Sequence, residues 1–479
     1  MECKLSKSAI PNSIWETYSA FANTYGGIIL LGVHEDLEEK DAAKRFVITG
    51  VENADKIRKD LWNMLNNTEK VSVNLLKDED VDEVTIDGKT VVYINVPRAD
   101  VSIRPVYVNG NPIRGAYKRN HEGDYHLPQA ELRMMLRDAD NESNDHMVLE
   151  HYTMQDVDMP SIVAYRNRFS SHNPDHVWNK LGPKEFLMQF GCYDIDRNTG
   201  KEWLTLAGLL MFGKGLPIRQ KFGNLRMDYI DKSNLIGEQR YSDRLTYDGT
   251  WENNLYNFLE MVLPKLLREL PRPFKMEGII RVDDTPQHKA VREAFTNAII
   301  HADLQMEGLL RVVKYNDRLE FTNPGLLKLP VERIYAGEES KARNQSMQNL
   351  LRMIGFGEGL GSGFPLILDA WNEKQWPRPE LVEEQDLMQV KLVLKIGINK
   401  GSVLKNVSKS VLKELSDRQL NIIQFIQESP DSTWAEMSER LKVSSKTIQR
   451  DIKDMQEKGI LSREGGRADG YWVIHDTDQ

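Results

Sequence analysis

Cysteine is the scarcest residue type in this chain of 479 residues, with only Cys3 and Cys192 present. Two thiols are too few for a disulfide framework or for a zinc site made of cysteine alone. Long hydrophobic runs are also lacking, since the apolar stretch at 26–33 is too short to span a bilayer. The first residues do not have the charged and then apolar pattern of a secretory signal peptide. We therefore expect a folded, cytoplasmic protein.

Composition and charge limit the class of protein further. Hydrophobic residues make up 40% and charged residues 28% of the chain, which is ordinary usage for globular domains and excludes a disordered or fibrous protein. The 63 basic and 72 acidic residues leave a net charge of -9, so any contact with nucleic acid must come from a local basic patch. At roughly 150 residues per domain, the length predicts about three domains.

Two polar stretches divide the chain. The acidic segment 138–145 is typical of a linker or an exposed connection. A second boundary follows an alternating strand predicted over 388–394. We therefore expect an N-terminal domain over 1–137, a connecting α/β segment over 147–280 packed with the domain that follows it, a third domain over 281–398 and a C-terminal domain over 412–479.

The N-terminal domain opens with a helix and a buried strand. Apolar side chains at helical spacing predict an amphipathic helix over 14–23, and the glycine pair 26–27 turns the chain into a strand over 28–33. A second strand is predicted over 90–96. Farther on, cationic side chains alternate with tyrosines, a composition that suits phosphate contacts and base stacking. The candidate nucleic-acid-binding residues of this stretch are Arg104, Arg114, Lys118 and Arg119.

These N-terminal motifs resemble the Schlafen-type AlbA-like domain. The resemblance rests on Glu2-Cys3-Lys4, on 20–24 with the glycine pair, on 31–33 and on Tyr117-Lys118-Arg119 followed by Gly123. It implies a nucleic-acid-binding module. Some Schlafen relatives cleave RNA with acidic residues, so the resemblance also implies an alternative, a metal-dependent nuclease in which Glu2 acts with Glu35 or Asp36.

The central block carries a line of polar residues along one predicted helix. Apolar spacing predicts a helix over 287–301, on which Glu293, Asn297 and His301 follow one another at intervals of four and share one face. A hairpin with strands over 309–315 and 318–322 comes next. The segment 355–363 then places glycine at alternate positions before a helix over 364–371, which lets backbone amides approach a phosphate closely.

The order of these features resembles the GHKL ATPase fold of gyrase and histidine kinases, and more closely the divergent, RecG-related form found in bacterial regulators. The resemblance implies bound ATP and Mg²⁺, with Asn297 as the metal ligand and Glu293 as the catalytic residue that orients or deprotonates water. Asn323 replaces the Asp that accepts a hydrogen bond from adenine in typical members, and the sequence leaves open whether ATP is hydrolysed. The implied nucleotide-binding residues are Asn297, His301, Asn323, Gly325, Arg343, Gly357, Gly359, Gly361 and Gly363.

The C-terminal block predicts a helix-turn-helix. Helices over 433–441 and 445–452 are separated by three residues, and strands over 459–463 and 470–474 bracket a loop. The pattern resembles the winged helix of bacterial DeoR-like regulators, which implies that the second helix contacts double-stranded DNA. In the sequence, Asp451, Asp454 and Glu457 nearly cancel the positive charge of that helix. The candidate DNA-contacting residues are Ser445, Lys446, Thr447, Gln449, Arg450, Arg463 and Arg467.

These predictions describe a multidomain protein of α/β and α+β class, with an AlbA-like domain, a GHKL-type α/β sandwich and a winged helix. We expect an ATP-responsive nucleic-acid-binding protein that regulates bacterial transcription and can form a homo-oligomer. Two alternatives stay open. One is a Schlafen-like nuclease of a defence system gated by ATP, and the other is an assembly protein whose modules all contact other proteins.

Overall fold

The structure, a computed structural model, describes residues 1–474 except 37, 42–43, 122, 141–142, 224, 236–238, 269, 271–275, 278–279, 282–283, 338, 358–362, 398–414, 429–431 and 465–470. The chain forms two units, one of residues 1–314, 320–367 and 381–392 and the other of 315–319, 368–380 and 393–479. Helices and β-sheets are mixed along the chain, which confirms the predicted multidomain α/β and α+β class.

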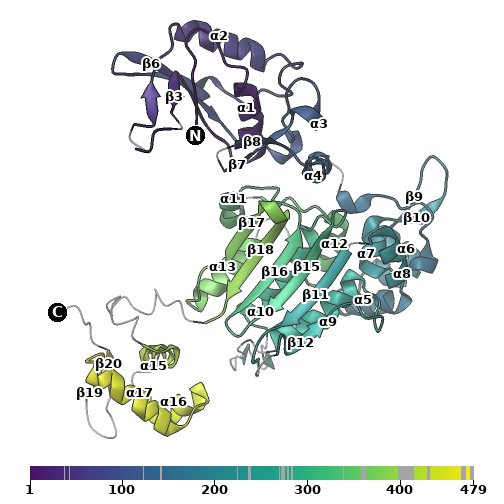
Figure 1. Ribbon diagram of the computed structural model, residues 1–479. Helices are drawn as coiled ribbons and strands as arrows, with labels where there is room; N and C mark the ends of the chain where they lie inside the picture. The colour runs from purple at the N-terminus through teal and green to yellow at the C-terminus, as the bar shows by residue number, and fades with distance from the viewer. Residues whose placement is uncertain are drawn as a thin grey trace. The chain divides into compact units, whose positions relative to one another are not determined.

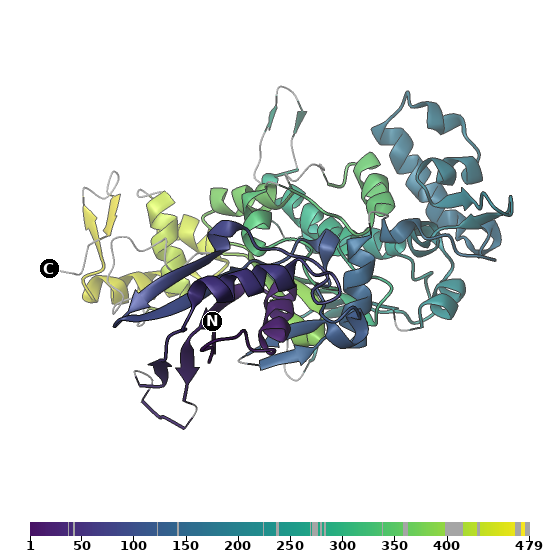
Figure 2. The same ribbon diagram turned by 90° about the horizontal axis from the view of Figure 1, so that it is seen from above.

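The N-terminal module, residues 1–139, is built on a four-stranded sheet in the order β1-β2-β6-β5 (Figure 1). Its strands are β1 (Glu2–Lys4), β2 (Gly27–Leu31), β5 (Val81–Ile86) and β6 (Lys89–Val96), accompanied by the pairs β3 (Val33–Glu35) with β4 (Phe46–Ile48) and β7 (Tyr117–Asn120) with β8 (Gly123–His126). Its helices are α1 (Ile14–Asn23), α2 (Ala54–Leu65), α3 (Pro112–Gly115) and α4 (Gln129–Ala139). β1 runs parallel to β2, and the other neighbouring strands are antiparallel. The β3–β4 hairpin, dark purple in Figure 2, projects from the rest of this module.

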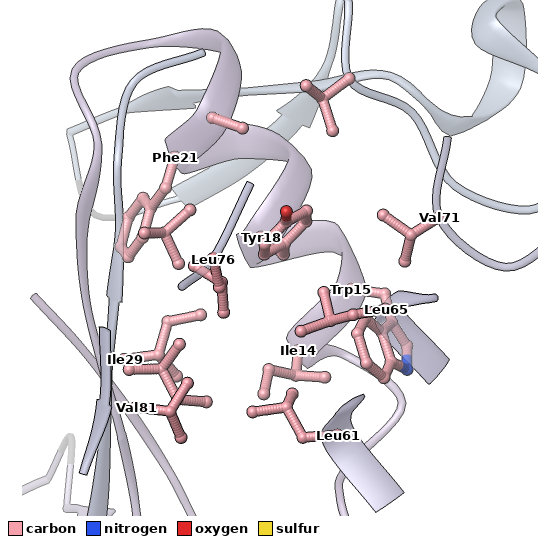
Figure 3. Close-up of a cluster of buried hydrophobic side chains, with 14 of the residues drawn as sticks. Ile14, Trp15, Tyr18, Phe21, Ile29, Leu61, Leu65, Val71, Leu76 and Val81 are labelled. Atoms are coloured by element: carbon pink, nitrogen blue, oxygen red, sulfur yellow. The ribbon is translucent and has the colours of Figure 1, made fainter. Parts of the chain in front are cut away.

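Helices α1 and α2 fold onto this sheet because each carries one apolar face. Trp15, Tyr18 and Phe21 of α1 recur at intervals of three and are each 2% exposed. They pack with Leu61 of α2 and Ile29 of β2 in one buried cluster, as Figure 3 shows. The predicted helix over 14–23 and strand over 90–96 are therefore confirmed as α1 and β6.

The strand predicted over 28–33 is interrupted by a glycine. Gly32 has a φ of 93°, in the left-handed region that favours glycine, and an added Cβ there would lie 2.9 Å from the backbone of Gly50. The chain bends at this point and divides β2 from β3. The apolar run in the sequence is continuous, so hydrophobicity alone did not indicate the break.

The central part of the chain contains a six-stranded sheet in the order β12-β11-β15-β16-β18-β17 (Figure 1). Its strands are β11 (Leu225–Asp231), β12 (Asp243–Leu245), β15 (Gly308–Lys314), β16 (Arg318–Pro324), β17 (Glu380–Glu384) and β18 (Gln389–Lys395). Its helices are α9 (Leu255–Leu267), α10 (Pro286–Ile300), α11 (Val331–Ala336), α12 (Gln345–Met353) and α13 (Gly363–Glu373), and a two-stranded pair is formed by β13 (Met276–Glu277) and β14 (Ile280–Arg281). β11 is parallel to β15 and antiparallel to β12. The predicted hairpin, closing strand and polar helix correspond to β15 with β16, to β18 and to α10.

A smaller group of elements precedes this sheet in the sequence. It consists of α5 (Met159–His172), α6 (Pro183–Gln189), β9 (Tyr193–Ile195), β10 (Glu202–Leu204), α7 (Leu206–Phe212) and α8 (Gly215–Lys221). Every residue of α7 is buried. Gly208 lets α7 approach the β9 side of the chain closely, because an added Cβ would lie 1.9 Å from the carbonyl oxygen of Cys192.

The described residues of the segment 138–145 are not an exposed linker, in contrast to the sequence prediction. Asp138 and Asp145 are 6% and 0% exposed. Asp145 Oδ2 accepts a hydrogen bond from the backbone N–H of Met347 at 2.8 Å, and Ser143 Oγ accepts one from Gln345 at 2.9 Å. These two side chains thereby cap the N-terminus of α12, whose own N-cap residue, Asn344, makes no capping hydrogen bond with its side chain. Asp138 and Asp145 are buried because partners distant in the sequence satisfy them, whereas Asp140 is exposed.

The C-terminal residues form the predicted helix-turn-helix and two strands. The elements are α15 (Asp417–Glu428), α16 (Trp434–Leu441), α17 (Ser445–Glu457), β19 (Leu461–Glu464) and β20 (Tyr471–Ile474). They share a core in which Ile422, Met437 and Ile448, one from each helix, are fully buried. The antiparallel pair β19 and β20 confirms the two wing strands.

Candidate functional site

A cavity that we call the α10 pocket lies against the polar face of α10. It contains about 1110 Å³ of empty space, its open mouth included. Residues of β16, the segments 326–329 and 339–343, and the start of α13 line its other sides. The predicted site residues that line it are Glu293, Asn297, His301, Asn323, Arg343, Gly357 and Gly363. The predicted Gly359 and Gly361 lie outside the described residues.

Two glycines bring the backbone against the carboxylate of Glu293. An added Cβ at Gly363 would lie 1.9 Å from Glu293 Oε1, and one at Gly357 would lie 3.5 Å from Oε2. Any side chain at Gly363 would therefore displace Glu293, which is only 6% exposed. Because Gly363 begins α13, the backbone N–H groups of the first turn of that helix lie at the pocket wall beside this carboxylate.

Thr296 is a polar residue of the α10 pocket that the sequence analysis did not single out. Its side chain is 2% exposed, and Oγ1 has no hydrogen-bond partner among the described residues. A buried hydroxyl left without a partner costs about 1–3 kcal/mol, so such a group in a pocket wall indicates a ligand that satisfies it. Thr296 follows Glu293 by three positions, and this spacing along one helix face is the signal that could have identified it.

Two lysines that the sequence analysis missed, Lys328 and Lys341, add positive charge to the pocket. Burial and the neighbouring Arg343 and Lys341 lower the pKa of Lys328. The Nζ atom of Lys341 lies 3.1 Å from Asp100 Oδ2, so the pocket wall also contacts the N-terminal module. No sequence pattern marks either lysine, because both lie in irregular segments that tertiary packing places at the pocket.

Arg343 does not offer its guanidinium to a ligand as predicted. It is 2% exposed, and its Nε and Nη2 atoms donate to the two carboxylate oxygens of Asp138 at 2.9 and 2.7 Å. Nη1 donates to the carbonyl oxygen of His301 at 2.7 Å, and Nη2 also donates to that of Leu326. Arg343 therefore joins α4, the end of α10 and the segment 326–329, and this structural role replaces the predicted phosphate contact.

His301 ends α10 and also lines the pocket. Burial, together with the nearby cations Arg343 and Lys328, lowers the pKa of His301 to about 4. Its imidazole is therefore neutral at pH 7. It presents a neutral hydrogen-bonding group to the pocket and adds no positive charge for an anionic ligand.

The end of β16 places the amide of Asn323 in the pocket. Asn323 is 7% exposed, and its Nδ2 atom donates to the carbonyl oxygen of Pro324 at 3.4 Å. Gly325 follows with a φ of 97°, which favours glycine, and an added Cβ would lie 3.0 Å from Arg343 Nη1. Gly325 allows the backbone to turn at this point, but it does not itself line the pocket.

The predicted basic surface of the N-terminal module is largely occupied by contacts within the protein. Arg104 is 7% exposed, and its Nη2 atom donates to the carbonyl oxygen of Lys328 at 3.5 Å. Lys118 pairs with Glu131 at 2.8 Å, and only 15% of its side chain is exposed. Burial therefore argues against Arg104 as a nucleic-acid contact, whereas Arg114 on α3 is exposed.

The remaining predicted residue of that surface, Arg119, belongs to an ionic network with the acidic residue of the nuclease alternative. Arg119 donates to Glu2 at 2.7 Å and to Asp124 at 2.8 Å, and Lys4 also pairs with Glu2 at 3.0 Å. Glu35 pairs instead with Arg45. Over the part of the chain that the structure describes, no group of three His, Cys, Asp or Glu side chains is placed to hold a metal ion.

Two acidic residues of helix α17 are engaged by partners at α15 or at the helix end, while Lys453 pairs with Glu457 along the helix and Arg450 Nε lies 3.9 Å from Asp451 Oδ1. Asp451 is 6% exposed and accepts hydrogen bonds from Arg418 of α15. Asp454 accepts from Gln419 at 2.6 Å and from Lys458 at 2.9 Å. Two of the three acidic residues expected to cancel the charge of this helix are thus engaged by α15 or by the helix end.

The predicted DNA-contacting residues of α17 lie within its first six positions. Ser444 caps the helix by accepting a hydrogen bond from the backbone N–H of Thr447. Lys446, Gln449 and Arg450 are exposed, Arg450 by 75% of its side chain. Arg463 on β19 lies over the ring of Trp472, whereas Arg467 is outside the described residues.

Four family models match parts of the chain. Residues 1–128 match "Schlafen, AlbA_2", residues 310–392 match "Putative ATP-dependent DNA helicase recG C-terminal" and residues 418–471 match "HTH domain". Residues 133–228 match a domain of unknown function, DUF8451. The second of these matches begins after α10, so Glu293 and Asn297 lie outside it.

Two solved structures are similar to parts of the chain. The DIP2311 protein from Corynebacterium diphtheriae aligns with 98% of this chain and 79% of its own, at 17% identity and a TM-score of 0.40. The N-terminal domain of a "Putative ATP-dependent DNA Helicase RecG-related Protein" from Nitrosomonas europaea aligns with 26% of this chain and 82% of its own, at 28% identity and a TM-score of 0.20. No curated protein matches the chain.

The matched domains indicate the general type of protein. Among the described residues, no helix combines the length and the apolar character that crossing a membrane requires. AlbA-like and helix-turn-helix domains together are typical of nucleic-acid-binding proteins. The chain therefore combines a Schlafen AlbA_2 domain, a RecG-related ATPase-like domain and a C-terminal helix-turn-helix domain, in the order that its motifs predicted.

Proposed function

We propose that this protein binds double-stranded DNA in response to ATP and regulates bacterial transcription. The α10 pocket is the observation that carries the proposal. There, the polar face of one helix meets a glycine of close approach, Gly363, together with two lysines and a buried hydroxyl without a partner among the described residues. The helix-turn-helix supplies an exposed basic face for the DNA.

The residues of the α10 pocket fit a nucleoside triphosphate with its magnesium ion. Lys328 and Lys341 would neutralise phosphate charge, and the Thr296 hydroxyl would donate a hydrogen bond to a phosphate oxygen. The amide oxygen of Asn297 would hold Mg²⁺, which typically takes one or two protein ligands and completes its shell with phosphate oxygens and water. When bound, the ion neutralises charge on the phosphates.

We expect slow turnover or none, so that ATP acts mainly as a conformational signal. The Glu293 carboxylate can orient or deprotonate a water molecule only if water fits between it and the terminal phosphate. The adenine contact is weakened in this chain. Since Nδ2 of Asn323 already donates to Pro324, its Oδ1 atom remains as the acceptor for the adenine amino group. A neutral amide accepts a weaker hydrogen bond than the carboxylate of typical GHKL proteins.

A ligand in the α10 pocket would be sensed by the N-terminal module, because residues of the pocket wall also hold that module. Lys341 pairs with Asp100 at 3.1 Å. The carbonyl oxygen of Leu327 accepts a hydrogen bond from Arg98 at 3.3 Å. A shift of the segments 326–329 and 339–343 on ATP binding would therefore change how the AlbA-like domain is held.

Calorimetric titration of the full chain with Mg-ATP tests the nucleotide part of the proposal. We expect heat of binding for the natural sequence and none for Gly363→Ala, whose Cβ would collide with Glu293. Gly223→Ala is the control, since its Cβ would meet only an ordinary contact at 3.8 Å, outside the α10 pocket. Protein that is folded by circular dichroism but gives no heat at high Mg-ATP concentration would refute nucleotide binding.

A mobility-shift assay tests the nucleic-acid part. Duplex DNA and RNA are titrated across salt concentrations with and without Mg-ATP, and strand integrity is followed in the same samples. We expect intact DNA to be retarded, with an affinity that changes when Mg-ATP is present. Cleaved strands would favour the nuclease alternative, and an absence of binding even at low salt would favour the assembly protein.

A further inference from the structure

A second cavity lies away from the α10 pocket, between α8, the beginning of β11 and β12. It contains about 720 Å³ of empty space, its opening included, and we call it the arginine cavity. Arg219, Arg226 and Arg244 line it together with Asp228, Tyr247 and Asn253. None of these residues lines the α10 pocket, so the arginine cavity is independent of the proposed ATP site.

The charge of the arginine cavity is opposite to that of the whole chain. Three guanidinium groups face one carboxylate, which leaves an excess of positive charge in the lining of a protein whose net charge is -9. Concave sites lined by one sign of charge concentrate ligands of the opposite sign. Guanidinium is also the cation that holds carboxylate and phosphate groups with two hydrogen bonds at once. The cavity therefore selects an anionic ligand.

One of the three guanidinium groups is held in place before any ligand binds. Arg219 lies over the ring of Tyr247, with 4.1 Å between the guanidinium carbon and the ring centroid. Its Nη1 atom donates to Asn253 Oδ1 at 3.3 Å. An arginine has five N–H donors, so this contact leaves most of them for a ligand. Fixing the side chain in advance reduces the entropy that it loses when an anion binds.

The carboxylate of the cavity is buried in the sheet. Asp228 of β11 is 6% exposed, and Arg226 approaches it to 3.5 Å while remaining 66% exposed itself. A buried carboxylate accepts hydrogen bonds from hydroxyl groups and repels a second anion. The ligand that fits therefore carries neutral hydrogen-bond donors on the side that faces Asp228 and an anionic group on the side that faces the arginines.

We propose that the arginine cavity binds a small phosphorylated molecule that also carries hydroxyl groups, such as a sugar phosphate. The phosphate contacts the guanidinium groups of Arg219 and Arg244, and a hydroxyl group donates to Asp228. A nucleic-acid strand fits this arrangement less well, because its continuous row of phosphates needs an extended track of cations, whereas this site is concave and has a carboxylate inside.

Calorimetry of the full chain with ribose 5-phosphate, ribose and inorganic phosphate tests the proposal. We expect ribose 5-phosphate to bind most tightly, and Arg219→Ala to weaken it by at least about tenfold, the effect of losing one charge-assisted hydrogen-bonding partner. Asp228→Asn is expected to reduce the preference for ribose 5-phosphate over inorganic phosphate. Lys221→Ala removes an equal charge from the same helix outside the cavity and is expected to bind as the natural sequence does.

Three results would overturn the proposal. The first is that folded protein gives no heat with ribose 5-phosphate. The second is that the natural sequence and Arg219→Ala bind ribose 5-phosphate equally. The third is that the protein binds single-stranded RNA but not ribose 5-phosphate, and that Arg219→Ala abolishes the RNA binding. Gly363→Ala separates the two sites. It is expected to lose Mg-ATP and to retain ribose 5-phosphate, so failure of either proposal is visible without the other.

Discussion

His301 shows at the scale of one residue how packing can reverse a local preference. The C-terminal end of a helix favours a protonated imidazole, because the helix dipole is negative there. Burial and the cations Arg343 and Lys328 act in the opposite direction and lower the pKa of His301 to about 4. The environment that tertiary folding creates therefore outweighs the helix dipole at this position.

The pKa of His301 predicts a pH dependence of stability. The folded-state pKa of about 4 lies below the ordinary value of 6.5, so the unfolded chain binds the proton more readily between these pH values. The free energy of unfolding therefore falls as the pH is lowered from 6.5 to 4, by up to about 3 kcal/mol from this group. Urea unfolding at pH 7 and pH 4.5 measures the effect.

His301→Gln is the comparison that isolates this residue, since the substituted chain keeps every other titrating group. We expect the loss of stability between pH 7 and pH 4.5 to be smaller in His301→Gln than in the natural sequence. Equal losses in the two proteins would show that His301 is protonated in the folded state at an ordinary pH.

The sequence predicted the residue types of the α10 pocket better than their roles. Glu293 and Asn297 could be placed together because the helix period is a local property, whereas Asn323 was added by the resemblance to the GHKL fold. Arg343 could not be assigned, because its partner Asp138 lies in another module and no spacing relates the two. Arg104 failed for the same reason. Arginines near tyrosines are typical of a nucleic-acid-binding surface. Only the folded structure shows that Arg104 contacts the segment around Lys328.

At the scale of the element, α17 illustrates how a helix of low net charge can present a basic face. Arg418 and Gln419 of α15 engage Asp451 and Asp454, and the exposed side retains Lys446 and Arg450. What matters for DNA binding is the charge of that exposed face and not the sum over the helix.

We predict that Arg450→Ala reduces the salt dependence of DNA binding. Loss of one phosphate contact should lower the slope of log affinity against log salt by about one and weaken binding to all duplexes alike. Lys458→Ala is the control, because it removes an equal charge at the far end of α17, where the lysine pairs with Asp454. Fluorescence anisotropy titrations at low and at moderate salt concentration measure this slope. An unchanged slope excludes Arg450 as a phosphate contact.

Elements with strong local signals were predicted in the right place, although α17 extends to Glu457, five residues beyond its predicted end. The helix predicted over 14–23 is α1, and the two helices of the helix-turn-helix are α16 and α17, because apolar period and capping residues act within each segment. The segment 138–145 was wrong as an exposed linker. Its acidic side chains look solvated in the sequence, and the groups that bury them, such as the start of α12, lie far along the chain.

At the scale of the whole molecule, the contact between Lys341 and Asp100 is the candidate route from nucleotide to N-terminal module. Lys341 faces the α10 pocket and Asp100 precedes the cis Arg104-Pro105 segment of that module. Burial raises the pKa of Asp100, but hydrogen bonds from Ser102 and Lys341 outweigh it and lower the value to about 2. The carboxylate of Asp100 is thus charged at any physiological pH, and its ion pair with Lys341 is maintained.

We predict that Asp100→Asn uncouples the two parts. Mg-ATP should still bind with nearly unchanged affinity, since Asp100 does not line the pocket, but the change in DNA affinity caused by Mg-ATP should shrink. Anisotropy titrations with and without Mg-ATP measure this difference directly. The control is Asp41→Asn on the surface of the same module. If Asp100→Asn keeps the full effect of ATP, this contact does not transmit the signal.

The buried pair of Asp138 and Arg343 decides where this protein can be divided for separate study. A fragment that starts after α4 would keep a guanidinium that is 2% exposed and lose the carboxylate that neutralises it, a change that typically costs about 3–5 kcal/mol. The polar segment near 140 looks like the natural place to cut, yet cutting there removes Asp138. A cut before Gln129 keeps Asp138 with Arg343 but separates Glu131 of α4 from Lys118, with which it pairs at 2.8 Å, so α4 is held by ion pairs to the parts on both sides of it.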